Sequence, residues 1–293
     1  MTPLSRVRAL RDWLSTWHVA ILLGLATIGS YGVAAYAIGV LIAPIAADTG
    51  WSTGAISAAY AIGVLGSGAV ALGVGHTLDR RGSRPAFLVT LGVGSVCLFA
   101  SASMASPLGF VVLWAAGSAA IGGGWYYQAT MPAAARLYPL SRPTAFAVLT
   151  LLGALASPIF YPATGLLVEA LGWRDALRTA VLAMTVLILP AALVVNAPPG
   201  AAAGTSEGLA TGIRRALRRP AVWRAMLAIG LTAAATNALI LHQVPAMQAS
   251  GLTLAAASAY GGARGALQIP GRLVLTPLTR TLGLPRAISI TYA

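Results

Sequence analysis

The chain has 293 residues, of which 58% are hydrophobic and only 9% are charged. A soluble domain of this length carries about 25% charged residues, so the composition excludes an ordinary soluble protein and predicts a membrane protein. The net charge of +13 raises the question of nucleic-acid binding, but the positions of the arginines, described below, favour a signal for membrane topology.

Long apolar runs predict membrane-spanning helices. No Asp, Glu, Lys or Arg lies between Arg84 and Arg136, a stretch that can hold two helices of about 20 residues each. The runs do not alternate between polar and apolar residues as β-barrel strands do. Charges and turn residues place eight spans in chain order, at 17–45, 53–75, 86–104, 107–132, 144–168, 176–196, 222–246 and 254–278. A ninth apolar run begins at Ala287.

The arginines predict the orientation of these spans. With the N-terminus in the cytoplasm, nearly all the basic residues fall in cytoplasmic loops, as the positive-inside rule requires. The outer loops hold only Arg174 and Arg178, which lie near Glu169 and Asp175. We therefore expect a multi-pass protein of the cell membrane, inner or plasma, with a cytoplasmic N-terminus, a lipid bilayer as its surroundings and no nucleic-acid partner.

The longest polar stretch divides the chain. Residues 197–221 are rich in Pro and Gly and include the basic run RRALRRP, a composition typical of a flexible linker whose arginines suit the inner headgroups. The sequence thus predicts an N-terminal six-helix half (1–196), a cytoplasmic basic linker (197–221) and a partial second half (222–293).

The loop between the second and third spans, GHTLDRRGSRP, concentrates charge in an apolar chain. It carries two glycines, an aspartate and two arginines at fixed spacing: Gly75, Asp79, Arg80, Gly82 and Arg84. This pattern resembles the loop signature of the major facilitator superfamily of secondary transporters, from which Thr77 and Ser83 depart. The resemblance implies an all-α polytopic fold with two six-helix halves. The chain would then hold one six-helix bundle and an incomplete second bundle, truncated after eight helices and a stub.

The same resemblance implies that this loop is a conformational switch, because in the family it makes breakable contacts with the eleventh helix. We expect Gly82 to permit a tight turn and Gly75 to allow close approach of a neighbouring helix. Asp79 can accept hydrogen bonds from Arg80 or Arg84, or lie at a positive helix N-terminus. The alternative is that these charges only set the topology.

Arg264 lies about 15 Å into the eighth predicted span, near the middle of the bilayer. Such an arginine is costly and usually faces a cavity or a partner, and its planar fork suits a carboxylate. We therefore expect Arg264 to bind an anionic substrate group; a structural arginine bonded to carbonyls is the alternative. His242 is a candidate for a proton or polar relay, or a packing residue.

In the family, the first, fourth and seventh helices face the central cavity. That resemblance nominates further substrate-binding candidates there: Tyr31, Tyr36, Trp125, Tyr126, Tyr127, Gln128 and Asn237. Four consecutive helical residues cover every face, so we expect only one or two of residues 125–128 to point inward. The three glycines at 122–124 predict close helix packing or a local break.

The overall pattern looks nearest to small organic-anion carriers such as the oxalate and monocarboxylate group. We expect a secondary active or facilitative transporter of a small organic solute, an organic anion such as a carboxylate, working by alternating access and monomeric if full length. Drug or metabolite efflux and a truncated, non-transporting fragment are the alternatives. The sequence has no metal-ligand cluster, P-loop or nucleophile elbow, so we expect no cofactor, no metal and no enzymatic activity.

Overall fold

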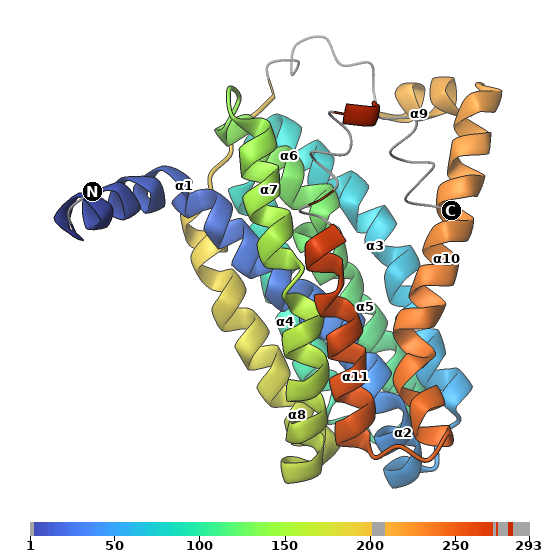
Figure 1. The fold of residues 1–293 in the computed structure, drawn as a ribbon. Coiled ribbons are helices and arrows are strands. Elements are labelled where there is room, and N and C mark those ends of the chain that lie inside the picture. Colours follow the sequence, from blue (N-terminus) through green and yellow to red (C-terminus); the bar gives the residue numbers. More distant parts are fainter. Residues whose placement is uncertain (1–2, 201–208, 272–273, 275–280, 284–293) are drawn as a thin grey trace.

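A computed structural model describes residues 3–200, 209–271, 274 and 281–283 of the chain, and every element in this part is a helix (Figure 1). The predicted stub from Ala287 and the end of the eighth expected span lie outside the described residues. The helices of the first half are α1 (Pro3–Tyr31), η1 (Gly32–Ala37), α2 (Ile38–Thr49), α3 (Thr53–Arg81), α4 (Arg84–Ser101), α5 (Pro107–Trp125), α6 (Tyr127–Leu137), α7 (Arg142–Gly153) and α8 (Ala156–Val194). The remaining helices are α9 (Leu209–Leu217), α10 (Pro220–Ala249) and α11 (Leu254–Ala266).

These helices confirm the expected polytopic architecture. Six described segments are long and apolar enough to cross a membrane. One of them, Arg142–Val194, folds back at Gly172, whose positive φ of 75° ends one pass and starts the next. α10 and α11 run antiparallel after the linker, and α11 begins at Leu254, where the eighth span was expected (Figure 1).

Small residues let the helices of the first half pack closely. α3 lies along α5, where added Cβ atoms at Gly63 and Gly123 would overlap Ser118 and Val70. Such close backbone approach is the usual basis of helix association in membranes. Large buried aromatic side chains, Trp114 and Phe87 among them, fill the remaining core of the bundle.

A polar cluster fixes the lower end of the bundle in Figure 1. The Trp173 indole donates a hydrogen bond to the Asp48 carboxylate at 2.8 Å, and the Arg174 guanidinium lies 3.7 Å from the same carboxylate. Arg174 also donates to the carbonyl of Ala102 at 3.0 Å. The cluster of Asp48, Trp173 and Arg174 thus joins the first, third and sixth passes.

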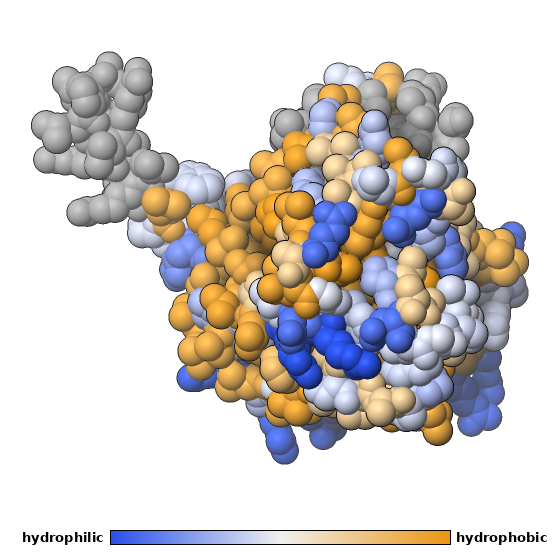
Figure 2. Space-filling model, turned by 90° about the horizontal axis from the view of Figure 1, so that it is seen from below, coloured by the Kyte–Doolittle hydropathy of each residue, from blue (hydrophilic) through white to orange (hydrophobic). Residues whose placement is uncertain are grey.

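Seen from the same end, hydrophilic residues gather near the middle of the face and hydrophobic ones cover much of its flank (Figure 2).

The second part of the chain docks on the first through α11 and the lower end of α10. α11 packs against α8, where a Cβ added at Gly265 would overlap Ser157. α10 contacts α2 near Gly39, but most of its length is exposed. Toward the upper end, where the arginine-rich loops lie, α10 leans away from α3 (Figure 1).

Candidate functional site

A π-helical turn brings two tyrosines of the first pass together. Residues five apart on an α-helix point about 140° away from each other, whereas one π turn, with its i→i+5 hydrogen bonds, returns them to nearly the same face. The stretch Gly32–Ala37 is π-helical, and the rings of Tyr31 and Tyr36 lie 6.3 Å apart. Tyr31 also stacks on Tyr126 with a centroid distance of 3.9 Å.

A helix break at Tyr126 changes which residues of the fourth pass face inward. Tyr126 is extended (φ −76°, ψ 174°) and separates α5 from α6. Because the helix is interrupted, Tyr126, Tyr127 and Gln128 all line cavities. The expectation that only one or two of residues 125–128 point inward is therefore wrong. The glycines before the break also pack closely, since an added Cβ at Gly124 would overlap Thr90.

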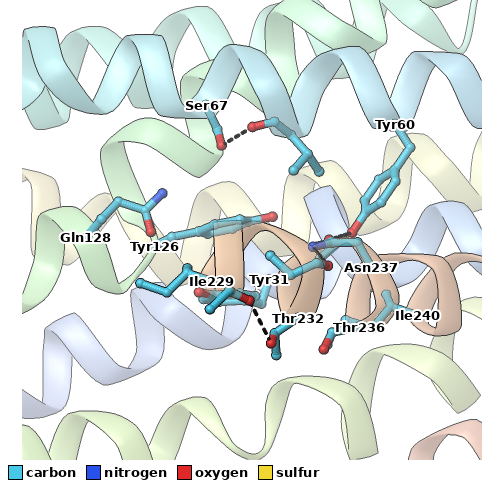
Figure 3. Close-up of a pocket in the computed structure, with 14 residues that line it drawn as sticks. Tyr31, Tyr60, Ser67, Tyr126, Gln128, Ile229, Thr232, Thr236, Asn237 and Ile240 are labelled. Carbon is cyan, nitrogen blue, oxygen red and sulfur yellow. Dashed lines mark hydrogen bonds between the residues drawn. The ribbon is translucent and has the colours of Figure 1, made fainter. Parts of the chain in front are cut away.

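The larger cavity lies between the two parts of the chain and has a volume of about 720 Å³. Figure 3 shows its lining, in which Tyr60 and Asn237 point toward each other and the Ser67 and Thr232 hydroxyls turn back to their own helices. The lining comes from α1, η1, α3, α6 and α10, with Tyr126 between α5 and α6: Tyr31, Ala35, Tyr60, Val64, Ser67, Tyr126, Gln128, Ala228, Ile229, Thr232, Ala233, Thr236, Asn237 and Ile240.

A smaller chamber of about 200 Å³ adjoins this cavity and contains Arg264. The two share three lining residues, Tyr31, Thr236 and Ile240. Arg264 is half-buried, and its Nε has no hydrogen-bond partner within the described part of the chain. The guanidinium of Arg264 also forms no ion pair with any described residue. The other lining residues of this chamber are Tyr36, Tyr127, Gly153, Ala154 and Gln268.

The structure thus brings most of the predicted binding candidates together. Arg264, Tyr36 and Tyr127 share the small chamber, Gln128 and Asn237 line the larger cavity, and Tyr31 borders both. Two residues lie elsewhere. Trp125 is fully buried and packs on Phe87 with ring centroids 4.4 Å apart, and His242 is exposed in a crevice between α3 and α10.

Sequence reasoning missed Tyr60. It lies on α3 and donates a hydrogen bond of 2.5 Å to the Asn237 side-chain carbonyl on α10. A polar ring in the middle of the otherwise apolar second span was the available signal. Neither residue type nor spacing identified its partner, because α3 and α10 lie far apart in the sequence.

The signature loop between α3 and α4 is held by a residue that was not predicted from the sequence to contact it. The Asp79 carboxylate pairs with the guanidinium of Arg136 from α6. The expectation that Arg80 or Arg84 would donate a hydrogen bond to it was therefore wrong. Arg136 also donates to the carbonyl of Leu78 at 2.7 Å. Arg80 and Arg84 are exposed, which suits interaction with headgroups or solvent.

Gly82 and Ser83 tie the loop to the end of α8. Gly82 has a φ of 82°, and an added Cβ would lie 2.7 Å from the Ala197 carbonyl, which confirms the tight turn expected there. The buried Ser83 hydroxyl accepts a hydrogen bond from the Ala197 amide at 2.8 Å. Gly75 shows no close approach, because an added Cβ would meet no described atom within 4 Å.

Helical passes surround two adjoining cavities, and one of these cavities holds a half-buried arginine. This arrangement defines a polytopic membrane protein built like a solute transporter. The family model of the Major Facilitator Superfamily matches residues 22–293, and the chain belongs to that family. No curated protein matches the chain.

Proteins of known structure that are similar to the chain include the D-xylose-proton symporter and tetrameric PepTSo2. The D-xylose-proton symporter matches 91% of this chain and 69% of its own length, with a TM-score of 0.63 and 14% identity, which shows the fold alone. Tetrameric PepTSo2, in two crystal forms, matches 77% and 80% of this chain with TM-scores of 0.49 and identities of 12% and 13%. The chain spans about half the length of PepTSo2.

Proposed function

We propose that this chain is a secondary active or facilitative transporter of a small organic anion such as a carboxylate, of the oxalate and monocarboxylate kind, working by alternating access. It would act as a monomer in the cell membrane with its N-terminus in the cytoplasm. The six-helix half (1–196) and the second part (222–293), joined by the linker (197–221), would move relative to each other around the two cavities.

The observation that carries this proposal is the environment of Arg264. A half-buried guanidinium without an ion pair among the described residues is costly in a membrane unless it faces a cavity or a partner. Its chamber is walled by Tyr31, Tyr36 and Tyr127. A carboxylate would satisfy the fork of Arg264 with two parallel hydrogen bonds.

Efflux of lipophilic cations has less support. Among the described residues that line the two cavities there is no Asp or Glu, so a cation would find no opposite charge, and it would be repelled by Arg264.

We also propose that the loop of Gly75, Asp79, Arg80, Gly82 and Arg84 acts as a switch. The ion pair of this loop with Arg136 and its hydrogen bond with Ala197 would have to break when the ends of the passes move.

Uptake into proteoliposomes that contain the purified chain tests the proposal. Radiolabelled carboxylates should accumulate, and Arg264→Gln should lower their uptake by about 30-fold or more, since it removes one partner of a buried charge pair. Arg264→Lys should retain part of the activity because it keeps the charge but loses the fork. Tyr260→Ala, an exposed position on the same helix, is the control. Equal uptake by wild type and Arg264→Gln would remove the arginine from the site.

A further inference from the structure

We infer that the substrate carries a single carboxylate on an uncharged, largely apolar body, and that Tyr31 selects for that body. The carboxylate would bind Arg264 in the small chamber while the body extends past Tyr31 into the larger cavity. This inference rests on the proposed function, because it requires Arg264 to bind the anion. It goes further by narrowing the proposed anions to monocarboxylates, which leaves out dicarboxylates such as oxalate.

The charge of the lining limits the substrate to one carboxylate. Arg264 is the one charged side chain among the described residues that line the two cavities. A dicarboxylate bound at Arg264 would place its second carboxylate among uncharged groups, and an unpaired charge in such surroundings is strongly unfavourable. An uncharged body avoids that cost.

The hydrogen-bonding state of the larger cavity favours an apolar body. Five of its polar side chains direct donors to the protein itself. Thr232 donates to the Ala228 carbonyl at 3.0 Å, Gln128 to the Gly122 carbonyl at 3.0 Å, and Ser67 to the Val64 carbonyl at 2.6 Å. Tyr60 and Asn237 bond to each other (Figure 3).

Apolar groups supply much of the remaining wall of this cavity. They come from three elements on different sides of the cavity: Ala35, Val64, Ala228, Ile229 and Ala233. A substrate body placed there gains by burying apolar surface. It finds few free donors, so a polar body would lose its bonds to water without replacement.

Tyr31 lies at the junction of the two volumes. It lines both, stacks on Tyr126 of the larger cavity and lies 5.3 Å, ring to ring, from Tyr127 of the small chamber. A substrate that occupies both volumes must therefore pass the Tyr31 ring, which offers it a rigid aromatic surface. The π turn that follows Tyr31 holds Tyr36 on the same side, so the junction is built from the first pass.

Binding of four matched probes to the purified chain in nanodiscs, measured by calorimetry, tests this inference. Propanoate has the head alone, 3-phenylpropanoate adds an aromatic body, succinate adds a second carboxylate, and 3-phenylpropanol lacks the charge. We expect 3-phenylpropanoate to bind about tenfold or more tightly than propanoate, because the phenyl group buries apolar surface. Succinate should bind more weakly than 3-phenylpropanoate, and 3-phenylpropanol should show no binding.

Two variants separate selection by Tyr31 from a structural role. Tyr31→Ala should reduce the preference for 3-phenylpropanoate over propanoate by about fivefold or more, because it removes the ring against which the body packs. Tyr31→Phe should keep that preference. A merely structural residue would change the affinities of both carboxylates by the same factor, so an unchanged ratio in Tyr31→Ala overturns the role of Tyr31.

The proposed function and this inference fail in different ways. If no carboxylate binds, or if Arg264→Gln binds them as wild type does, the proposed function is wrong and the inference falls with it. If binding depends on Arg264 but succinate binds most tightly, the function stands and the single-carboxylate inference is wrong.

Discussion

The two parts of the chain face each other on two sides of the cavities, at α8–α11 and at α3–α10. The packing at these two interfaces differs. Between α8 and α11, glycines place backbone against side chain, as Gly265 does with Ser157 and Gly165 with Ser258. Between α3 and α10 lies a crevice of about 610 Å³. In the described part of the chain, a single hydrogen bond, from Tyr60 to Asn237, joins α3 to α10.

This difference shows how a transporter can be firmly assembled and still able to open. Close glycine packing depends on many short contacts, which are lost together when two helices separate. A single hydrogen bond contributes only about 0.5–1.5 kcal/mol and can be exchanged for bonds to water. We therefore expect α8 and α11 to act as a stable contact about which the α3–α10 side opens and closes.

The largest expected effect is on the α8–α11 contact. Gly265→Ala should lower the free energy of unfolding by about 2 kcal/mol, because the new methyl group overlaps Ser157. Thermal unfolding in detergent measures this change. The matched control is Gly230→Ala on α10, where an added Cβ meets no described atom within 4 Å, and where the helix should gain up to about 1 kcal/mol. Equal melting temperatures for the two variants would contradict the contrast.

A smaller effect is expected where α10 does touch the first half. An added Cβ at Gly39 would lie 2.9 Å from the Ile240 carbonyl, and this carbonyl also accepts a hydrogen bond from Tyr161 at 2.8 Å. Gly39→Ala should therefore cost about 1–2 kcal/mol and push α10 away from α2. Labelling of a cysteine placed at Val244, which is fully buried, should become faster. If labelling stays unchanged, the contact at Gly39 does not close the lower end.

The smallest effect is expected on the open side. Tyr60→Phe removes the bond to Asn237 and should lower the free energy of unfolding by about 1 kcal/mol or less. The same melting experiment measures it, with Tyr260→Phe at an exposed site as the control. A loss as large as that of Gly265→Ala would mean that the α3–α10 side is as firmly built as the α8–α11 side.

The sequence predicted the passes well because hydrophobic runs and arginine positions report directly on the bilayer. It also predicted the tight turn at Gly82, since few residue types fit a positive φ. It singled out Arg264, which lines the small chamber, because an arginine is rare in a membrane interior; its role in binding stays a prediction. The turn at Ala154 and Leu155 between α7 and α8 fits the Pro158 that follows, because proline removes a backbone donor and clashes with the preceding turn.

Other features of the site could not be predicted from spacing. α-helical periodicity separates Tyr31 from Tyr36 and turns parts of 125–128 outward, but a π turn and an extended Tyr126 change both faces. The partner of Asp79 was missed because Arg136 is distant in sequence and meets the loop only when α6 and α3 end side by side. Such features depend on tertiary packing, which overrides local pattern.

The π turn at Gly32–Ala37 has one more consequence, for changes in chain length. A π turn holds one residue more than the α turn that it replaces. Deleting one residue there would let the first pass become a regular α-helix, whereas the same deletion in α3 would shift every later side chain out of register. After such a deletion Tyr31 and Tyr36 would lie four residues apart on an α-helix, a spacing that keeps two side chains on one face. The first pass is thus the place where a chain shorter by one residue keeps both its span and the alignment of these tyrosines. A single-residue deletion at this point should therefore disturb neither membrane insertion nor the Tyr31–Tyr36 pair, whereas one in α3 should disturb the register of that pass.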